Sequence, residues 1–380
     1  MVVSRTVAVV GGGQLARMMV PPATELAITL KTMVEAEDTS AAQVTVHSPV
    51  GDPKNMEDMR NLVEGADVLT FEHEHIPQEI LRNCKKVSIQ PPPSALLYAQ
   101  NKLKMREKMQ EIGAPVPRWK KAETSEDVAE FGEEIGWPII AKTPTGGYDG
   151  KGVRVVKSAD GIDDWLKSGP VLLEEKVPFT RELAVLLARR PSGEIKHWPV
   201  SQSIQENGVC SEVIAPAPNL SDEVMTQAQE VGTLIATELG VTGVLAVEMF
   251  IVDGEECQLS VNELAMRPHN TGHWTIEGAV TSQFEQHLRA VLDLPLGDTT
   301  AIPGVWVMKN LLGSNYDDAA HALPQALAAY PKAHVHIYGK SVRPGRKLGH
   351  VTTRADSVEE ARERARATVD ILFGEPETKE

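Results

Sequence analysis

The chain has 380 residues, of which 42% are hydrophobic and 24% charged, as expected for a soluble globular protein of two or three domains. Its 38 basic and 53 acidic side chains give a formal net charge of −15, which repels nucleic acids and anionic membranes, so neither is expected as a partner. No apolar run approaches the roughly 20 residues that span a bilayer, the N-terminus lacks the features of a secretory signal, and the three cysteines show no pairing pattern, so we expect a reducing, cytoplasmic location.

The first 93 residues alternate short apolar strands with helices. Apolar runs predict strands at residues 7–10, 44–47 and 68–71, with a helix near residues 14–19. This alternation is typical of a parallel α/β sheet. Residues 28–38 are poorly patterned, so the sequence leaves the second strand undefined. Three prolines at 91–93 then precede a helix that is expected to begin at a Ser94 cap and to run to about Ile112.

A second unit combines strands, helices and a glycine-rich loop. Thr124 and Asp127 have the spacing of a capping box and predict a helix that ends before Gly136. A helix capped by Ser221 is expected to reach Leu239. Strands are expected at residues 139–142, 153–156, 171–175 and 183–188, and as an antiparallel pair at 244–252 and 258–264. The C-terminal part is expected to hold strands around 305–309 and 334–338 and a helix over 358–373.

The first candidate site is the run Gly11-Gly12-Gly13-Gln14-Leu15-Ala16, which fits the pattern G-x-G-x-x-G/A between a strand and a helix. Glycines let the backbone approach a phosphate there, and the helix N-terminus supplies N–H groups. A dinucleotide site also needs an acidic residue after the second strand, for which Glu35, Glu37 and Asp38 are candidates. Three interpretations stay open: a dinucleotide site, another phosphate or substrate contact, and a structural tight turn.

The second candidate is the glycine-rich segment from Lys142 to Gly152, which lies between two predicted strands. Its glycines predict a hairpin loop whose N–H groups could fold over phosphates, and Lys142 could contact an anionic oxygen. The segment lacks the P-loop pattern G-x-x-x-x-G-K-[ST]. An ordinary flexible hairpin is the structural alternative.

The third candidate pairs Glu248 with Glu263 on the two strands predicted as antiparallel. Mg²⁺ prefers hard oxygen ligands, usually one or two carboxylates together with nucleotide phosphates. A connecting loop of even length would place both carboxylates on one face. A two-residue turn would leave them roughly 13 Å apart, so a bridged metal requires a loop of about four to six residues. A structural ion pair is the alternative.

Two further segments gather basic and polar side chains. Residues 267–274 combine a guanidinium, two imidazoles and an amide, which suit a small oxyanion and a transferring phosphoryl group. A metal site and a structural loop are the alternatives there. Residues 340–350 concentrate cations in an otherwise acidic protein, so we expect them to bind an anion such as phosphate, the alternative being a solvated basic turn.

Together these segments resemble the carboxyaminoimidazole ribonucleotide synthases of the ATP-grasp superfamily over nearly the whole chain. The matching strings are GGGQLARMM, AKTPTGGYDGKG, LLEEKVPFTRELAV, VEMF…NELAMRPHNTGHWT and RPGRKLGH. Met266 departs from the family pattern, in which a proline is common at that position. The resemblance implies an α/β and α+β fold: an N-terminal doubly wound parallel-sheet domain (1–95), a central two-lobed ATP-grasp domain (96–300, with a mobile lobe at about 115–185) and a small C-terminal domain (301–380).

The resemblance also implies a reaction. Members of this family join ATP, bicarbonate and aminoimidazole ribonucleotide to give N5-carboxyaminoimidazole ribonucleotide, ADP and phosphate in purine biosynthesis, with Mg²⁺ or Mn²⁺ as the cofactor. They are typically homodimers, and their product passes to a mutase. Phosphorylation of bicarbonate to carboxyphosphate is the expected first step, and Asp149 or His273 is the expected acceptor of the amine proton.

Roles implied by the resemblance are assigned position by position. The expected ATP contacts are Lys102, Lys142, Gly147, Tyr148, Asp149, Gly150, Lys151, Gly152, Val153, Glu174, Glu175, Lys176, Val177, Glu182, Gln205, Asn262 and Glu263. The expected metal ligands are Glu248 and Glu263. The expected catalytic residues, around bicarbonate and its phosphorylated product, are Arg267, His269, Asn270, His273 and Asp149. The expected contacts of the aminoimidazole nucleotide are Gln14, Glu72, Tyr148, Lys340, Arg343 and Arg346.

Rival functions are a ligase for another acyl donor, such as a formyl-transferring purine enzyme, and a dinucleotide-dependent oxidoreductase. The oxidoreductase rests on residues 11–16 alone and leaves the glycine-rich loop and the Glu248/Glu263 pair without a role. A non-catalytic nucleotide sensor is a third alternative.

Overall fold

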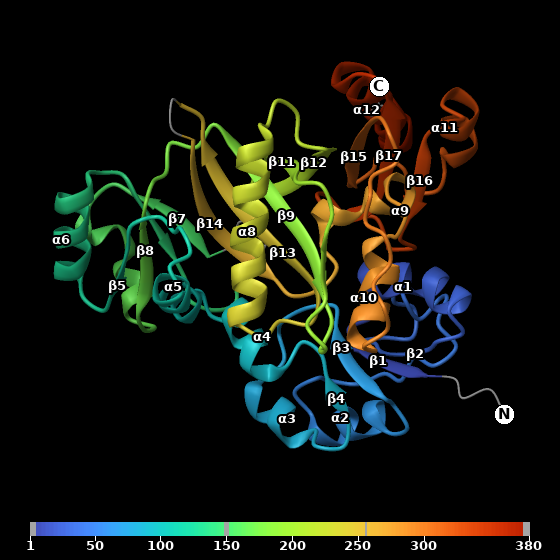
Figure 1. Ribbon diagram of the computed structural model, residues 1–380, viewed down its shortest axis with the longest axis horizontal. Helices are drawn as coiled ribbons and strands as arrows, with labels where there is room; N and C mark the ends of the chain where they lie inside the picture. Colours follow the sequence, from blue (N-terminus) through green and yellow to red (C-terminus); the bar gives the residue numbers. More distant parts are fainter. Residues whose placement is uncertain (1–4, 148–151, 255–256, 375–380) are drawn as a thin grey trace.

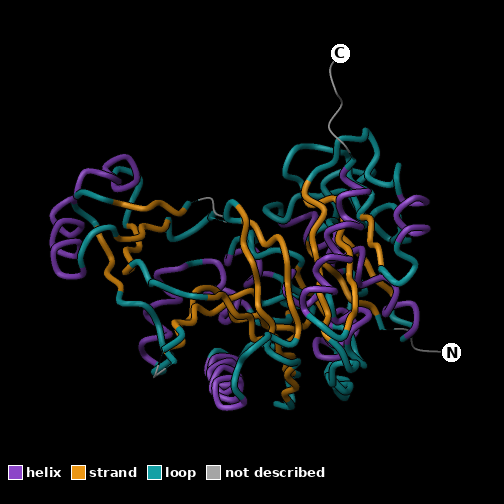
Figure 2. The backbone as a smooth tube through the Cα atoms, turned by 90° about the horizontal axis from the view of Figure 1, so that it is seen from above, coloured by secondary structure: helices purple, strands orange, loops and turns teal. Residues whose placement is uncertain are grey.

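The computed structural model describes residues 5–147, 152–254 and 257–374, which form three sheets (Figure 1). A parallel sheet lies in the N-terminal part, a long antiparallel sheet occupies the centre, and a small antiparallel sheet forms a lobe at one end. Seen from above, the lobe and the C-terminal elements lie at opposite ends of the molecule (Figure 2). No helix in the described ranges is long and apolar enough to cross a membrane.

The N-terminal sheet has the strand order β2-β1-β3-β4, and all of its pairings are parallel. Strands β1 and β3 are buried on both faces, which explains why they read as unbroken apolar runs in the sequence. The predicted parallel α/β unit is therefore confirmed. Its elements are β1 (Thr6–Val10), α1 (Gln14–Glu25), β2 (Thr29–Met33), α2 (Met56–Val63), β3 (Val68–Phe71), α3 (Gln78–Asn83) and β4 (Ser88–Ile89).

The strand predicted at residues 44–47 is wrong. Among these residues only His47 takes part in sheet pairing, through an isolated bridge to Lys31 of the edge strand β2. The consecutive β-branched residues Val44, Thr45 and Val46 mimic a strand, but Val46 is 90% exposed and so does not pack on a sheet face.

The single helix predicted from Ser94 to Ile112 is also wrong, because the chain breaks it at Asn101. Two helices form instead, α4 (Pro93–Gln100) and α5 (Lys102–Glu111). Asn101 is extended, and its side chain accepts a hydrogen bond from the Lys104 N–H at 3.0 Å, so it caps the second helix. The break lets the Lys102 N–H donate to the Pro144 carbonyl oxygen at 2.8 Å, at the base of the glycine-rich loop.

The lobe is an antiparallel sheet of order β5-β8-β6-β7 with a hydrophobic core of its own. The predicted capping box of Thr124 and Asp127 is confirmed. Its elements are β5 (Trp119–Ala122), α6 (Ser125–Ile135), β6 (Ile139–Lys142), β7 (Val153–Val156), η1 (Ala159–Ile162), α7 (Asp163–Leu166) and β8 (Val171–Glu175).

The central sheet runs β14-β13-β9-β11-β12-β15-β17-β16, with β10 paired to β9. Helix α8 covers β9, and α10 lies between this sheet and α1 of the N-terminal unit (Figure 1). The elements before the C-terminal part are β9 (Arg181–Arg189), β10 (Ile195–His197), β11 (Ser201–Glu206), β12 (Val209–Ala215), α8 (Asp222–Glu238), β13 (Gly243–Val252), β14 (Gln258–Ala265), η2 (Asn270–Gly272), α9 (Thr275–Gly278) and α10 (Gln283–Val291).

The C-terminal strands continue the central sheet and do not form a sheet of their own. Strand β15 pairs with β12 on one side and with β17 on the other, and α12 packs on β15 and β17. The C-terminal elements are β15 (Val305–Leu312), α11 (Leu323–Ala329), β16 (His334–Ile337), β17 (Lys347–Ala355) and α12 (Val358–Phe373).

Candidate active site

A cleft of about 1540 Å³ lies between the lobe, the central sheet, the N-terminal unit and the basic C-terminal loop. Most of the described residues that the sequence analysis selected line this one cleft. They are Gln14, Glu72, Lys102, Lys142, Gly147, Val153, Glu174, Glu175, Lys176, Val177, Glu182, Gln205, Glu248, Asn262, Glu263, Arg267, His269, Asn270, His273, Lys340 and Arg346.

Strands β13 and β14 place Glu248 directly opposite Glu263. The loop between them spans residues 253–257 and has an odd length, so an unbroken ladder would place Asn262 opposite Glu248. A register shift between Glu248 and Met249 adds one residue to β14 and brings Glu263 into that position. Paired residues of antiparallel strands share a face, so both carboxylates face the cleft.

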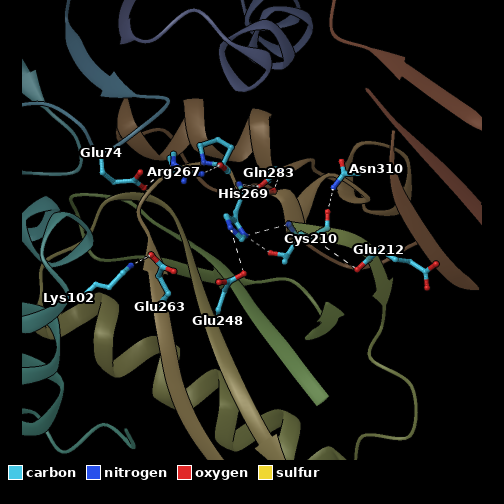
Figure 3. Close-up of polar contacts among 12 residues, drawn as sticks. Glu74, Lys102, Cys210, Glu212, Glu248, Glu263, Arg267, His269, Gln283 and Asn310 are labelled. Carbon is cyan, nitrogen blue, oxygen red and sulfur yellow. Dashed lines mark hydrogen bonds and ion pairs between the residues drawn. The ribbon is translucent and has the colours of Figure 1, made fainter. Parts of the chain in front are cut away.

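The Glu248 carboxylate lies in a field of like charge. Burial and the neighbouring carboxylates of Glu263 and Glu182 raise the pKa of Glu248 to about 8. Glu263 forms an ion pair with the Lys102 ammonium at 2.5 Å, and the His269 Nε2 lies 3.9 Å from Glu248 Oε1 (Figure 3). A pair of converging carboxylates with too little positive charge around it is an arrangement that a divalent cation would neutralise.

A buried charge cluster fixes Lys142 next to these carboxylates. The Arg106 guanidinium donates through Nε to Glu174 and through Nη2 to the Asn262 carbonyl oxygen at 2.8 Å. The Lys142 ammonium lies 2.6 Å from the other Glu174 oxygen and donates to Asn262 Oδ1 at 2.9 Å. Burial raises the pKa of Glu174, but the charges of Arg106 and Lys142 outweigh this effect and hold it at about 2. The Glu174 carboxylate is therefore ionised and balances the charges of Arg106 and Lys142, in a cluster that joins α5, β6, β8 and β14.

The segment after β14 brings four predicted catalytic residues to the cleft, of which Figure 3 labels Arg267 and His269. The Arg267 Nε lies 2.9 Å from Glu74 Oε1, so a carboxylate of the N-terminal unit anchors this guanidinium. The Asn270 amide is buried, and neither of its polar atoms has a hydrogen-bond partner among the described residues. A buried, unpaired amide is costly, which indicates that a polar ligand completes this part of the cleft.

Both imidazoles of this segment are neutral. Burial and the neighbouring Arg267 and Lys347 lower the pKa of His269 to about 3. Burial, together with the neighbouring His269, lowers the pKa of His273 well below its usual value. His269 also caps the 3₁₀ helix η2 by accepting from the Thr271 N–H at its Nδ1, which leaves its Nε2 for the cleft.

The side chain of Glu72 occupies the space next to the glycine turn before α1. The Glu72 carboxylate accepts from the Gly13 N–H at 2.6 Å and from the Leu15 N–H at 3.4 Å. A Cβ at Gly13 would lie 2.1 Å from Glu72 Oε1, so glycine is required for this close approach. The Gly13 and Leu15 N–H groups, which a dinucleotide pyrophosphate would need, are already bonded to the Glu72 carboxyl group, which argues against the dinucleotide interpretation.

The basic C-terminal loop meets the same turn. The Lys340 ammonium donates to Gln14 Oε1, and burial lowers the pKa of Lys340 to about 8 although Glu72 opposes that shift. Arg346 and Lys347 also line the cleft there. Three cationic side chains thus gather at the mouth formed by α1 and this loop, which suits a phosphate group.

Some predicted residues do not reach the cleft. Gly152 lies at the base of the loop, where its carbonyl oxygen accepts from the Thr143 N–H at 2.9 Å, and Arg343 closes a turn by accepting from the Arg346 N–H at 3.1 Å. Neither lines the cleft, so the expected ATP contact of Gly152 and the expected nucleotide contact of Arg343 gain no support. Tyr148, Asp149, Gly150 and Lys151 lie outside the described residues.

Three residues that hold the site together were not predicted from the sequence: Glu74, Arg106 and Gln283. Glu74 follows a predicted strand within the run Glu72-His73-Glu74-His75, a density of ionisable residues that could have indicated a site. Arg106 and Gln283 lie in ordinary helical patterns, and only their contacts distinguish them.

Family models match three consecutive parts of the chain: a ribonucleotide synthetase preATP-grasp domain (residues 4–100), an ATP-grasp domain (107–284) and a phosphoribosylaminoimidazole carboxylase C-terminal domain (307–364). The chain is 47% identical over 377 residues to the N5-carboxyaminoimidazole ribonucleotide synthase of Corynebacterium ammoniagenes, covering 96% of this chain and 91% of that protein.

Solved structures agree with these matches. The carboxyaminoimidazole ribonucleotide synthase of Aspergillus clavatus complexed with ATP is 35% identical with a TM-score of 0.87, covering 97% of this chain and 98% of that one. The Aspergillus clavatus enzyme in complex with ADP and 5-aminoimidazole ribonucleotide is 33% identical with a TM-score of 0.88, at the same coverage of both chains.

Proposed function

This chain belongs to the N5-carboxyaminoimidazole ribonucleotide synthase family of ATP-grasp ligases, and from that premise we propose how its cleft performs the reaction. It is a ligase that carboxylates aminoimidazole ribonucleotide at the expense of ATP in purine biosynthesis. A single observation carries the assignment of roles: Glu248 faces Glu263 in the same cleft that holds Lys142 and Arg267. The relatives and solved structures named above favour the carboxylating ligase over the formyl-transferring and oxidoreductase alternatives.

The ATP triphosphate is proposed to lie between the glycine-rich loop and β13–β14. Lys102 and Lys142 supply cationic groups for its oxygens, and Glu248 and Glu263, with Asn262 beside them, would hold Mg²⁺ or Mn²⁺. The divalent ion would neutralise charge that develops on the phosphoryl oxygens. The raised pKa of Glu248 supports this assignment, because a cation removes the repulsion that keeps that carboxyl protonated.

The nucleoside part of ATP is proposed to lie against the hinge between β8 and β9. Residues Glu175, Lys176 and Val177 line the cleft at that point, next to Glu182 and Gln205. Burial raises the pKa of Glu182, which a hydrogen bond to Gln205 opposes. Polar side chains at such a buried position suit the ribose hydroxyls. Residues 147–153 are proposed to cover the phosphates, as the family resemblance implies.

Bicarbonate is proposed as the carboxyl donor, held by Arg267, His269 and Asn270. Bicarbonate is a poor electrophile because its leaving oxygen is anionic, whereas carboxyphosphate carries phosphate as a good leaving group. The anchored guanidinium and the unpaired amide supply donors for the oxyanions of both species. Neutral imidazoles add hydrogen bonds without adding charge that would compete for the ligand.

Aminoimidazole ribonucleotide is proposed to lie between α1 and the basic loop. Lys340 and Arg346 would hold its 5′-phosphate, with Gln14 and Glu72 on the aminoimidazole side. Tyr148 and Asp149 keep the substrate roles that the resemblance implies, and Asp149 remains the proposed acceptor of the amine proton. Arg267 and Asn270 line the same cleft, so the amine is proposed to face them, where carboxyphosphate would form.

The wider setting is also a proposal. The family resemblance suggests a homodimer in the cytoplasm whose product passes to a mutase. It also suggests domain boundaries at residues 95/96 and 300/301.

A phosphate-release assay tests the reaction. Phosphate release with ATP and Mg²⁺ should require bicarbonate and increase when aminoimidazole ribonucleotide is added. Arg267→Ala should lower product formation by about 100-fold or more while leaving ATP affinity intact, because it removes an oxyanion donor outside the nucleotide site. Arg364→Ala, at an ion pair on α12 remote from the cleft, is the matched control. Equal losses of ATP affinity and turnover in Arg267→Ala would show that this residue serves the nucleotide.

A further inference from the structure

One buried glutamine contacts the backbone of His269 and the imidazole of His273 in the proposed bicarbonate site. Gln283 begins α10 and is fully buried. Its Oε1 accepts from the His269 backbone N–H at 2.8 Å, and its Nε2 donates to the His269 carbonyl oxygen at 2.8 Å. The same Nε2 lies 3.0 Å from the His273 Nδ1 (Figure 3 shows Gln283 beside His269).

These backbone contacts determine the positions of the oxygen and the nitrogen of the Gln283 side-chain amide. A backbone N–H can only donate and a carbonyl oxygen can only accept, so the amide oxygen must face the His269 N–H and the NH₂ group must face the His269 carbonyl. The second hydrogen of that NH₂ group then points at the His273 Nδ1. That nitrogen must accept, so the imidazole is neutral and carries its proton on Nε2.

We infer that Gln283 is a positioning residue that locks His273 in the tautomer protonated on Nε2, so that His273 presents an N–H donor to the carboxyl-transfer site. The ligand of this donor rests on the proposed function, whereas the tautomer does not. An N–H aimed at a developing oxyanion stabilises it without a proton transfer. With its proton on Nε2 and its Nδ1 bonded to Gln283, His273 would not accept the amine proton, which leaves Asp149 as the proposed acceptor.

The surrounding packing leaves the glutamine little freedom. A Cβ at Gly272 would lie 2.4 Å from Gln283 Oε1, so the loop carrying both histidines rests directly on the amide. The Gln283 N–H donates to Thr275 Oγ1 at 2.9 Å, which ties the start of α10 to α9. The His273 ring is held between Phe284 and His350, with centroids 5.7 and 5.0 Å away.

The same helix provides a matched control. Gln286 is also fully buried, and it clamps a backbone unit in the same manner: its Nε2 donates to the Gly297 carbonyl oxygen at 2.9 Å and its Oε1 accepts from the Gly297 N–H at 2.7 Å. No histidine takes part in this clamp, and Gln286 does not line the cleft. Gln286→Glu therefore reproduces the structural cost of placing a carboxyl group in such a position.

The tautomer is measured directly by ¹⁵N NMR of the full chain labelled at histidine. His273→Gln identifies the His273 signals by their loss. We expect Nδ1 to resonate as the unprotonated nitrogen and Nε2 as the protonated one in the wild-type protein. The opposite pattern overturns the inference whatever the reaction proves to be.

Kinetics test the role of that donor. Gln283→Glu should lower kcat/KM for bicarbonate by about 100-fold, since a carboxylate would draw the proton to Nδ1, whereas Gln286→Glu should stay close to the wild type. Equal losses in the two variants would reduce Gln283 to a structural residue and overturn the inference.

A second pair of variants leaves Gln283 unchanged. His273→Gln keeps an N–H near the Nε2 position but cannot act as a base, and His273→Phe removes both capacities. We expect the glutamine variant to be at least about tenfold more active than the phenylalanine variant. Equal activity overturns the donor role. If bicarbonate does not bind at this site at all, its KM stays unchanged in every variant while the tautomer signal persists, so that failure is distinguishable.

Discussion

Replacing Arg106 by methionine should destabilise the protein strongly, because it leaves the buried Glu174 carboxylate with a single cationic partner. The Arg106 and Glu174 side chains are 0% and 3% exposed, so water cannot replace the lost ion pair. Lowering the Glu174 pKa from 4.5 to about 2 corresponds to about 3 kcal/mol at 1.36 kcal/mol for each pKa unit. Lys142 retains part of this stabilisation, whereas the Asn262 carbonyl loses its donor at a cost of about 1 kcal/mol. We expect a net loss of about 3 kcal/mol, close to measured values for broken buried pairs.

Urea denaturation of Arg106→Met and the wild type at neutral pH measures this loss. Arg364→Met is the matched control, since it breaks an ion pair with Glu360 that is 33% and 47% exposed and should cost less than about 1 kcal/mol. Adding Glu174→Gln to Arg106→Met should recover part of the loss, which a double-mutant cycle quantifies. Similar midpoints for Arg106→Met and Arg364→Met would refute the reasoning.

The pH dependence of this difference has a defined sign. The pKa of Glu174 is lowered in the folded state, so its stabilising effect is complete above its unfolded value of 4.5 and is lost as the pH falls toward 2. The gap between Arg106→Met and the wild type should therefore narrow in that range. A gap that stays constant from pH 6 to the onset of acid unfolding would contradict this origin of the stability.

Two further predictions concern ligands. Glu248→Gln should abolish Mg²⁺-dependent phosphate release. The free protein should become no less stable, because a glutamine amide resembles the protonated carboxyl that a pKa of about 8 gives Glu248 at neutral pH. Calorimetric titration with Mg²⁺ and ATP would reveal the lost metal affinity, and undiminished turnover would exclude Glu248 as a ligand. The pKa of Lys340 is about 8, so kcat/KM for aminoimidazole ribonucleotide should fall as the pH rises through that value, because the neutral amine no longer attracts phosphate. Lys340→Arg should move this decline to higher pH. An unchanged pH profile in that variant would assign the decline to another group.

The sequence predicted the strands that line the cleft because their patterns are strong. Buried strands such as β3 and β8 read as apolar runs bounded by turn residues, and the structure places them at the predicted positions. The residues at 44–47 show the limit of that signal, because only His47 bridges to the neighbouring strand β2 although the run is rich in β-branched residues. Asn101 shows another limit, because this single capping residue divides a segment that helical periodicity predicts as one helix into two helices.

The candidate site was predictable where chemistry is concentrated in short motifs. The convergence of Glu248 and Glu263 depends on a register shift that the sequence pattern does not predict. The sequence could only indicate which loop lengths would bring the two carboxylates together. Arg106 and Gln283 contribute through partners 68 and 14 positions away in the chain, and nothing local distinguishes them from other helical residues. Long-range hydrogen bonds of this kind are decided by tertiary packing.

The continuity of the central sheet constrains how the enzyme can move. Because β15 is hydrogen-bonded to β12, swinging the C-terminal part away would break a ladder and expose two strand edges. The lobe from β5 to β8 instead carries a hydrophobic core of its own, so we propose that it is the part that moves, as one rigid body. The proposed phosphate contact Lys340 and the carboxylates of Glu248 and Glu263 would then keep their relative positions while the lobe moves against them.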